Sequence, residues 1–477
     1  MFETGIRQFR MAMSMVWGYK ADTDNIARLV DDALATIAEF GAPGGEVREL
    51  LDGPFADPKA REEFVTRGIR RTARRLAERS PFYARRFAAA EVRPDQLDLD
   101  GLRAIPVTVK RDLVERQRDF HCADVAPQLT TRTTGTTGRP AEIWLSRYEL
   151  ALWSGLGALS GVLRRELLPT DVLQVNLSSR ATLSVHLNAA VCRLVGACSR
   201  VLGIVPPDEA LDALAEGGAT ILLTNPSYLA ELIVAARRRG MGPGDFSLRR
   251  VDVGGEILSS SVAAAAAATL GVERVRDSFA MTEVAPITAP ICSQGHLHHD
   301  IQSGLVELLD LDTGEPAEPG ALSTVVLTPY YPYRECMPVF RYDSRDVVRR
   351  LPDEPLTCEI AGLPGTSAIL GKADQIIRLG PDDVIAPRPL VEAVESLPSQ
   401  PWPARFRVTV RDGRPHMMLP AAALTGLGER ATRQHLLERG LDVDLIVVDD
   451  DQAVSLRNLR CDLHETTFVA QPALIGD

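Results

Sequence analysis

The chain has 477 residues, of which 45% are hydrophobic and 25% charged, and its formal net charge is −11. The sequence pI is about 5.4. This acidic balance lacks the basic footprint of a nucleic-acid-binding protein. The length predicts about two to four domains of ~100–200 residues each, enough for a large buried core.

Neither the start of the chain nor its apolar runs indicate export or a membrane. Arg7 and Arg10 interrupt the early apolar run, and no stretch of about 18 apolar residues follows. We therefore expect a cytoplasmic protein without a membrane partner. The seven cysteines are odd in number and scattered, which favours core or metal roles over disulfides.

Hydrophobic periodicity predicts a mostly helical leader over residues 1–60, with one helix at 23–40, and a further helix at 58–78. The leader is interpreted as padding for the main domain, with contacts in a homodimer as the alternative. After residue 140, strand-like runs alternate with helical ones, which predicts an α/β fold with largely parallel sheets. The predicted strands are 128–132, 141–145, 172–175, 220–223, 250–253 and 323–327, and the predicted helices are 148–163, 184–194, 226–239 and 260–270.

A proline-rich stretch at 352–364 indicates a domain boundary. The remaining residues predict a small α+β unit, with strands at 406–410 and 445–448. The fold class is therefore α/β: a large N-terminal domain whose mixed or parallel sheets are flanked by helices, followed by a small C-terminal domain.

Residues 133–140 read Thr-Thr-Gly-Thr-Thr-Gly-Arg-Pro between two predicted strands. Glycines permit tight or positive-φ backbone, so that successive N–H groups can converge on an anion, and hydroxyls add donors without bulk. The pattern predicts a polyphosphate loop, with a plain Gly/Thr hairpin as the alternative. It is not a Walker A loop, because Arg139 is followed by Pro140 and a strand rather than by a helix.

This loop resembles the phosphate loop of the adenylate-forming superfamily, and four more segments resemble that family's motifs in the same order. They are Gly254-Gly255-Glu256, Asp277-Ser-Phe-Ala-Met-Thr-Glu283, Arg341-Tyr-Asp-Ser-Arg-Asp346 and Gly371-Lys-Ala-Asp374. Three other segments resemble the phenylacetate–CoA ligase branch, namely residues 80–83, 102–110 and 334–338. The resemblance covers roughly residues 70–465.

The resemblance implies a division of the chain. A large AMP-binding domain would span residues 1–371, including the helical leader at 1–60. Residues 372–374 would form a hinge, and residues 375–477 a small mobile domain. In this family the small domain rotates about the position of Asp374, since a hinge needs a residue that absorbs a large change in φ and ψ.

The resemblance also implies a site for ATP or AMP and for Mg²⁺. Glu283 would bind the magnesium ion and Thr282 would touch the α-phosphate, and both are candidate catalytic residues. Asp346 would accept the ribose hydroxyls. The other candidate nucleotide-binding residues are Thr133, Thr134, Gly135, Thr136, Thr137, Gly138, Arg139, Gly254, Gly255, Glu256, Asp277, Ser278, Phe279, Arg341, Lys372 and Asp374.

The C-terminal segment departs from the family pattern. The family places a catalytic lysine there, but no lysine follows Lys372. Arg457 occupies the lysine's position in the stretch 455–462 and is either a catalytic cation or a solvated one. Residues 378–389 also depart from the family's post-hinge segment, so use of coenzyme A is less firmly implied than use of ATP.

A cysteine- and histidine-rich segment predicts a structural zinc site. The predicted ligands are Cys292, His298, Cys336 and Cys358, with His296 and His299 as alternates. The cysteine positions resemble those of zinc-bearing members of the branch. Reduced cysteines in or near the core are the alternative.

The resemblance places the pocket for the second substrate in segments that carry several polar side chains. The candidate substrate-binding residues are Ser179, Arg180, His186, Asn225, Tyr228 and Ala280. A polar pocket suits a polar or aromatic acid. In the alternative, Arg180 and His186 face solvent or bind backbone.

The implied function is ATP-dependent activation of a carboxylic acid as acyl-AMP, with release of pyrophosphate and transfer to coenzyme A or a carrier protein. One alternative is a diazotase-like enzyme of secondary metabolism, which activates nitrite to diazotise an aryl amine. The other alternative is a degraded relative that binds nucleotide or ligand without turnover.

Overall fold

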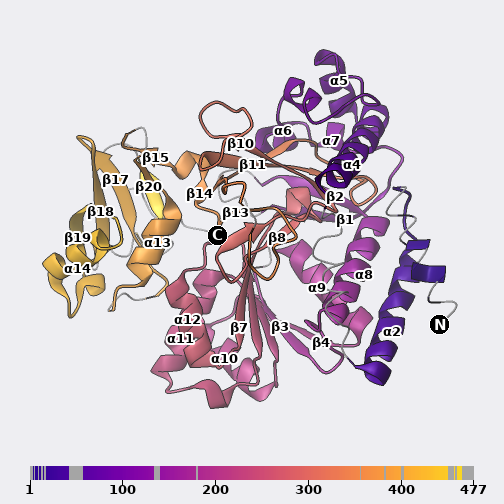
Figure 1. Cartoon of the computed structure of the whole chain (residues 1–477). Coiled ribbons are helices and arrows are strands. Elements are labelled where there is room, and N and C mark those ends of the chain that lie inside the picture. Colours follow the sequence, from indigo (N-terminus) through magenta and orange to yellow (C-terminus); the bar gives the residue numbers. More distant parts are fainter. Residues whose placement is uncertain are drawn as a thin grey trace.

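The computed structural model describes residues 4, 6–8, 10–11, 14, 18–41, 57–133, 140–178, 181–354, 356–380, 383–398, 402–449, 456 and 459–464. Figure 1 shows a large α/β body, with a smaller unit in yellow at one side. We call residues 377–464 the C-terminal unit. Among the described residues, no helix combines the length and the apolar character that crossing a bilayer requires.

A six-stranded sheet forms the centre of the large body, in the order β4-β3-β5-β6-β7-β8. Its first five strands run parallel and β8 is antiparallel to β7. The strands are β3 (Val172–Asn176), β4 (Cys198–Val201), β5 (Ile221–Thr224), β6 (Arg250–Gly254), β7 (Arg274–Ala280) and β8 (Thr288–Pro290). The predicted α/β class with a largely parallel sheet is confirmed.

Helices cover both faces of this sheet (Figure 1). Ile221 packs with one group of helices and Leu222 with the other, because neighbouring side chains of a strand point to opposite faces. One face carries α10 (Pro207–Glu216), α11 (Pro226–Arg238) and α12 (Ser260–Leu270), and the other carries α8 (Arg147–Leu163), α9 (Thr182–Val195) and, outside them, α2 (Thr23–Phe40). The described part of the leader thus pads the main body.

A four-stranded antiparallel sheet lies beside the first, in the order β10-β11-β12-β14. Its strands are β10 (Gly304–Asp310), β11 (Leu322–Pro329), β12 (Tyr342–Arg349) and β14 (Gly371–Lys372). Three two-stranded sheets complete the body and its junction, and they pair β1 (Pro127–Arg132) with β2 (Glu142–Ser146), β9 (His296–His298) with β13 (Gly365–Ser367), and β15 (Ile377–Arg378) with β16 (Val384–Ile385).

The segment before residue 116 is bound tightly to the start of β12. It contains α4 (Pro58–Arg79), α5 (Pro81–Ala89) and α6 (Lys110–Glu115). The amide of Thr108 donates to the Arg341 carbonyl at 2.7 Å, and the Thr108 carbonyl accepts from the Asp343 amide at 2.9 Å. The hydroxyl of Thr108 donates to the Phe340 carbonyl, also at 2.7 Å. Because these groups are buried, the contacts fix where α6 begins.

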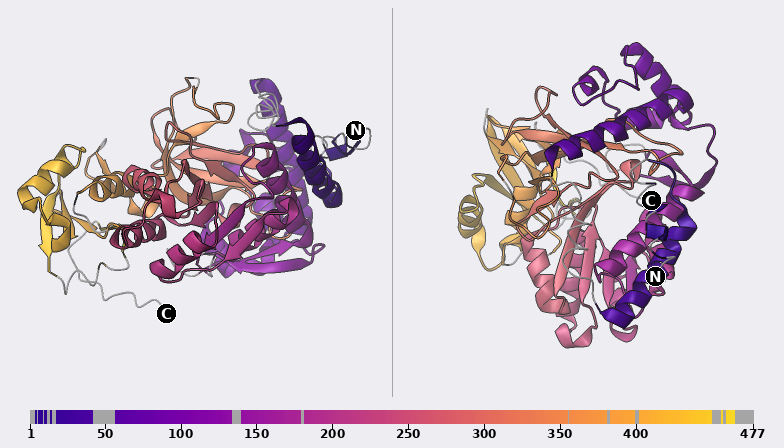
Figure 2. Two further views of the ribbon diagram at one scale, coloured as in Figure 1. Left: turned by 90° about the horizontal axis from the view of Figure 1, so that it is seen from below. Right: turned by 45° about the vertical axis from the view of Figure 1, so that its right-hand side comes forward.

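The C-terminal unit has its own apolar core, built around Phe406, Val408 and Leu436. Its sheet has the order β19-β18-β17-β20, formed by β17 (Arg407–Arg411), β18 (Arg414–Pro420), β19 (Asp444–Val448) and β20 (Asp462–His464). The helices α13 (Pro387–Glu395) and α14 (Gly428–Leu437) pack on it. In the left-hand view of Figure 2, this unit and the leader helices lie at opposite ends of the molecule.

Candidate functional site

Glu283 lies just after β7, in the short 3-10 helix Thr282–Val284, and its side chain is buried. The hydroxyl of Tyr342, the first residue of β12, donates to Glu283 Oε1 at 3.4 Å. Burial raises the pKa of Glu283, whereas the charges of Lys110 and Lys372 and the Tyr342 hydrogen bond act to lower it. Tyr342 thus orients the predicted magnesium ligand, a role that the sequence did not reveal. Thr282 beside it is half-buried.

Asp346 and Lys372 form a direct ion pair between neighbouring strands. They face each other where β12 pairs with β14, and Lys372 Nζ lies 2.8 Å from Asp346 Oδ2. The same ammonium donates to the Ser344 carbonyl at 3.1 Å. Burial raises the pKa of Asp346, and Lys372 counteracts this shift. Two residues further on, Asp374 is exposed, where the chain leaves β14 for the C-terminal unit.

Lys110 is a second cation at this place, and the sequence assigned it no role. It begins α6, whose start is fixed by the Thr108 contacts to β12. Its charge, like that of Lys372, opposes the rise in the pKa of Glu283. The scarcity of lysine could have drawn attention to Lys110, because the chain has lysine only at positions 20, 59, 110 and 372.

Most of the predicted phosphate loop, residues 134–139, lies outside the described residues. Thr133 closes the base of that loop: its amide donates to the Ala141 carbonyl, and its hydroxyl accepts from the Ala141 amide, both at 3.0 Å. Ser179, Arg180 and Arg457 also lie outside the described residues, and their roles stay predictions.

Arg341 joins separate parts of the large body, and its predicted nucleotide contact stays a prediction. Its guanidinium forms an ion pair with Glu307 at 3.0 Å and donates to the carbonyls of Leu102 and Ile105. Its side chain is almost fully buried. A buried guanidinium is stable only when it is paired and hydrogen-bonded, and these partners account for its position.

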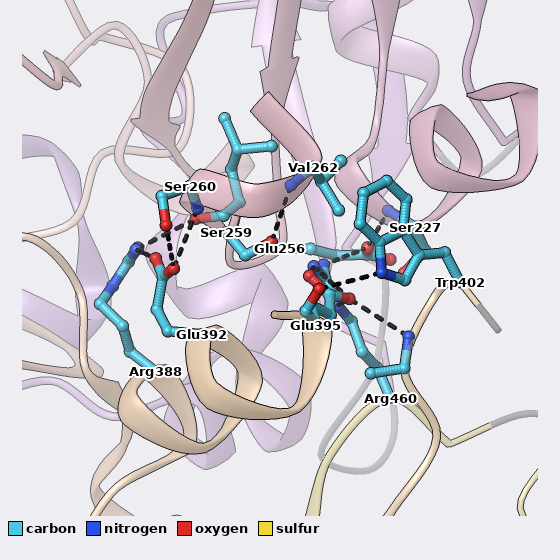
Figure 3. Close-up of polar contacts among 12 residues, drawn as sticks. Ser227, Glu256, Ser259, Ser260, Val262, Arg388, Glu392, Glu395, Trp402 and Arg460 are labelled. Carbon is cyan, nitrogen blue, oxygen red and sulfur yellow. Dashed lines mark hydrogen bonds and ion pairs between the residues drawn. The ribbon is translucent and has the colours of Figure 1, made fainter. Parts of the chain in front are cut away.

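The predicted adenine-side loop lies under the C-terminal unit. Gly254 ends β6, and a Cβ atom there would lie 2.9 Å from the Ser278 carbonyl oxygen, so the close approach of the two strands requires glycine. Gly255 has a φ of 82°, in the left-handed region. Glu256 accepts from the Ser227 amide at 2.9 Å and contacts Arg460 of the C-terminal unit (Figure 3).

Asp277, on the adjacent strand β7, faces the same interface. Burial raises its pKa to about 6, while Arg388 and Arg460 act in the opposite direction. Ser278 and Phe279 follow on β7 and are half-buried, and Phe279 packs against the main core. The end of β6, residues of β7 and the exposed loop after β6 therefore meet where the C-terminal unit docks.

The described substrate candidates lie on three elements of the large body, namely α9, β7 and the start of α11. His186 is exposed on α9, and Ala280 is exposed at the end of β7. Asn225 caps α11 by accepting from the Tyr228 amide at 2.8 Å, and the buried Tyr228 hydroxyl donates to the Val205 carbonyl at 2.6 Å. One polar atom each of Asn225 and Tyr228 is used within the fold. The substrate contacts of Asn225, Tyr228, His186 and Ala280 stay predictions.

A compact cysteine–histidine cluster lies near β9. One ligand atom each of Cys292, His296, His298 and Cys358 lies within 4.8 Å of the others. Cys358 Sγ is 3.2 Å from His298 Nε2, and His298 Nδ1 is held at 3.0 Å from the Leu363 carbonyl, which leaves Nε2 free to bind a metal. His296 Nδ1 is buried with no hydrogen-bond partner among the described residues. Two thiols and two imidazoles suit a closed structural zinc site.

The cluster corrects the predicted ligand set at one position. Cys336 lies elsewhere, in the buried core beside Glu149, whose carboxylate accepts its amide at 3.2 Å. His296, one of the two alternates, takes its place. The other alternate, His299, is buried outside the cluster, with Nε2 3.1 Å from the Thr366 hydroxyl. His296 and His298 lie on the same side of β9, because residues two apart in a strand share a face, whereas His299 follows the strand.

No protein-family model matches the chain. Among curated proteins, the phenylacetate–coenzyme A ligase of Aromatoleum evansii is 26% identical over 307 residues, which are 59% of this chain and 64% of that protein. The chain therefore spans less than two thirds of that relative's length. The enzyme of the same name from Pseudomonas putida is 24% identical over 64% of this chain and 70% of its own. That from Escherichia coli K12 is 25% identical over 70% and 74% respectively.

Among solved structures, 2-hydroxyisobutyryl-CoA ligase in the postadenylation state, in complex with 2-HIB-AMP, has a TM-score of 0.70 at 19% identity. The alignment covers 83% of this chain and 87% of that one. The same ligase in the thioesterification state has a TM-score of 0.59 at 19% identity, with coverage of 86% and 91%. ATP-bound MatB from Rhodopseudomonas palustris has a TM-score of 0.51 at 16% identity, with coverage of 67% and 64%.

We predict that purified protein never exposed to chelator carries about one equivalent of zinc, because closed thiolate sites retain the ion. The variants Cys358→Ser and Cys336→Ser separate the two ligand sets. Elemental analysis should find zinc lost from Cys358→Ser and kept in Cys336→Ser. Native protein with less than about a tenth of an equivalent would refute the site.

Proposed function

We propose that the chain is a member of the adenylate-forming superfamily, in its phenylacetate–CoA ligase-like branch, and that it acts as an ATP-dependent acid ligase. It activates a carboxylic acid as acyl-AMP with release of pyrophosphate, and passes the acyl group to coenzyme A. The observation that carries this proposal is the gathering of Glu283, Asp346, Lys110 and Lys372 around the start of β12.

The charges of this group suit the reaction. Glu283 would bind Mg²⁺ through a hard oxygen ligand, and the ion would neutralise phosphate charge. Asp346 would accept the ribose hydroxyls, with Lys372 fixing its carboxylate. Acyl-adenylate formation needs mainly positioning and charge stabilisation, so preorganised cations beside the phosphates contribute most to the rate.

Lys110 is our candidate for part of the charge that the family's C-terminal lysine supplies. No lysine follows Lys372, and the charge of Lys110 already acts on Glu283. Arg457 remains the second candidate, by its sequence position. The two differ in origin: Lys110 belongs to the body and is fixed to β12, whereas Arg457 belongs to the C-terminal segment.

Release of pyrophosphate from ATP and Mg²⁺ tests the proposed reaction. Aromatic and aliphatic acids should be screened with and without coenzyme A, and nitrite with aryl amines in parallel. We expect release that depends on an acid and a thioester product that depends on coenzyme A. Release supported by nitrite and an amine, with no acid active, would replace the ligase by the diazotase-like alternative. The absence of release in both arms would favour the non-catalytic relative.

Two substitutions separate the candidate cations. We predict that Lys110→Met slows adenylate formation by roughly 10²–10³-fold, the scale of one lost donor to developing charge, with a smaller change in KM for ATP. Lys59→Met, on the exposed start of α4, is the matched control and should leave the rate unchanged. If Arg457→Ala shows the large loss and Lys110→Met does not, Arg457 supplies the charge and this assignment of Lys110 fails.

A further inference from the structure

The C-terminal unit docks on the large body through charged side chains, and Arg460 lies at their centre (Figure 3). Its guanidinium forms a bidentate pair with Glu395 of α13, with Nη2 3.1 Å from Oε1 and 3.0 Å from Oε2. Arg460 Nη1 reaches across the interface to Glu256 Oε2 at 3.3 Å. The side chain of Glu395 is fully buried and that of Arg460 only 12% exposed, so both ends of the pair are held in place.

Glu256 also contacts the body on its own side. The oxygen that meets Arg460 accepts the Ser227 amide at 2.9 Å, in the first turn of α11. The residue belongs to the predicted adenine-side loop, directly after Gly254 and Gly255. A movement of the C-terminal unit would therefore break a contact to this loop and to the N-terminus of α11, where carboxylates are favoured.

A second contact lies beside the first. Glu392 of α13 accepts the amide and the hydroxyl of Ser260, at 2.9 and 2.7 Å, where α12 begins (Figure 3). Arg388 donates to the Leu258 carbonyl at 3.2 Å, and its charge acts on the half-buried Asp277. Trp402 packs against the apolar core of α11 and α12, with Arg237 5.3 Å from its ring centroid. One face of the C-terminal unit thus contacts the adenine-side loop and the helices α11 and α12.

We propose that Arg460 is a positioning residue that latches the C-terminal unit onto Glu256 and so holds the enzyme in the arrangement of the adenylate-forming half-reaction. The proposal rests on the proposed ligase function. The chain superposes better on the postadenylation form of 2-hydroxyisobutyryl-CoA ligase than on its thioesterification form, with TM-scores of 0.70 and 0.59. Rotation at the predicted hinge would separate Arg460 from Glu256, while the pair with Glu395 moves as part of the unit.

Glu256→Gln is the cleaner variant, because it weakens the latch and leaves the buried Arg460–Glu395 pair intact. Arg460→Gln is the second variant. Arg414→Gln is the matched control, since Arg414 pairs with Asp444 inside the C-terminal unit and away from the interface. The reporter is the Ser260 amide, whose hydrogen bond to Glu392 exists only while the unit is docked.

Amide hydrogen exchange measured by mass spectrometry tests the latch without any substrate. We expect the segment containing Ser260 to exchange about three- to tenfold faster in Glu256→Gln and Arg460→Gln, as a partly exposed ion pair is lost, and to be unchanged in Arg414→Gln. Native exchange in Glu256→Gln would overturn the latch. The exchange experiment does not require the chain to form an adenylate. Failure of the ligase proposal would instead be seen as the absence of pyrophosphate release from the native protein.

The rates of the two half-reactions provide a second test of the latch. A purely structural role of the contact would change both rates equally. ATP–pyrophosphate exchange reports the first half-reaction, and thioester formation from preformed acyl-adenylate reports the second. We expect Arg460→Gln to slow the first by a larger factor than the second, and this variant is used because Glu256 itself is a candidate nucleotide-binding residue. Equal slowing of both would show that Arg460 and Glu256 only support folding, and would overturn the proposal.

Discussion

The ion pair between Asp346 and Lys372 connects the candidate site to the route of the chain. Asp346 is buried, and a carboxylate removed from water needs a partner. That partner comes from β14, the last strand before the chain enters the C-terminal unit. The same contact therefore neutralises a predicted nucleotide-binding residue and anchors the point from which the unit would rotate. The geometry of the site and the position of the hinge cannot change independently.

The other charges of the site come from distant parts of the sequence, and each has its own anchor. Lys110 is positioned because Thr108 binds the backbone at the start of β12. Arg341, two residues before Asp343, uses its guanidinium to join the segment around Leu102 to Glu307 on β10. The segment before residue 116 thus determines where a cation stands relative to Glu283.

Local patterns in the sequence predicted the elements well and the contacts poorly. The helices at 23–40 and 260–270 match the observed helices, because apolar periodicity and end signals are local properties. The motifs did not predict the contacts of Arg341 to Glu307 or of Tyr228 to Val205, since both partners lie far away in the sequence. For the zinc cluster, the sequence named three of the four clustered residues as ligands and the fourth, His296, as an alternate, and Cys336 lies outside the cluster. The sequence showed Arg460 and Tyr342 only as members of motifs. It did not predict the contact of Arg460 with Glu256 or that of Tyr342 with Glu283.

We propose that the charged group of Glu283, Asp346, Lys110 and Lys372 binds a nucleotide, with Asp346 holding the ribose. Calorimetric titration of ATP and Mg²⁺ into native and Asp346→Ala protein tests it most directly. Loss of a charged hydrogen bond costs ~1.5–3 kcal/mol, so we expect the dissociation constant for ATP to rise by roughly ten- to a hundredfold in the variant. An ATP affinity that is the same in both proteins would contradict the account.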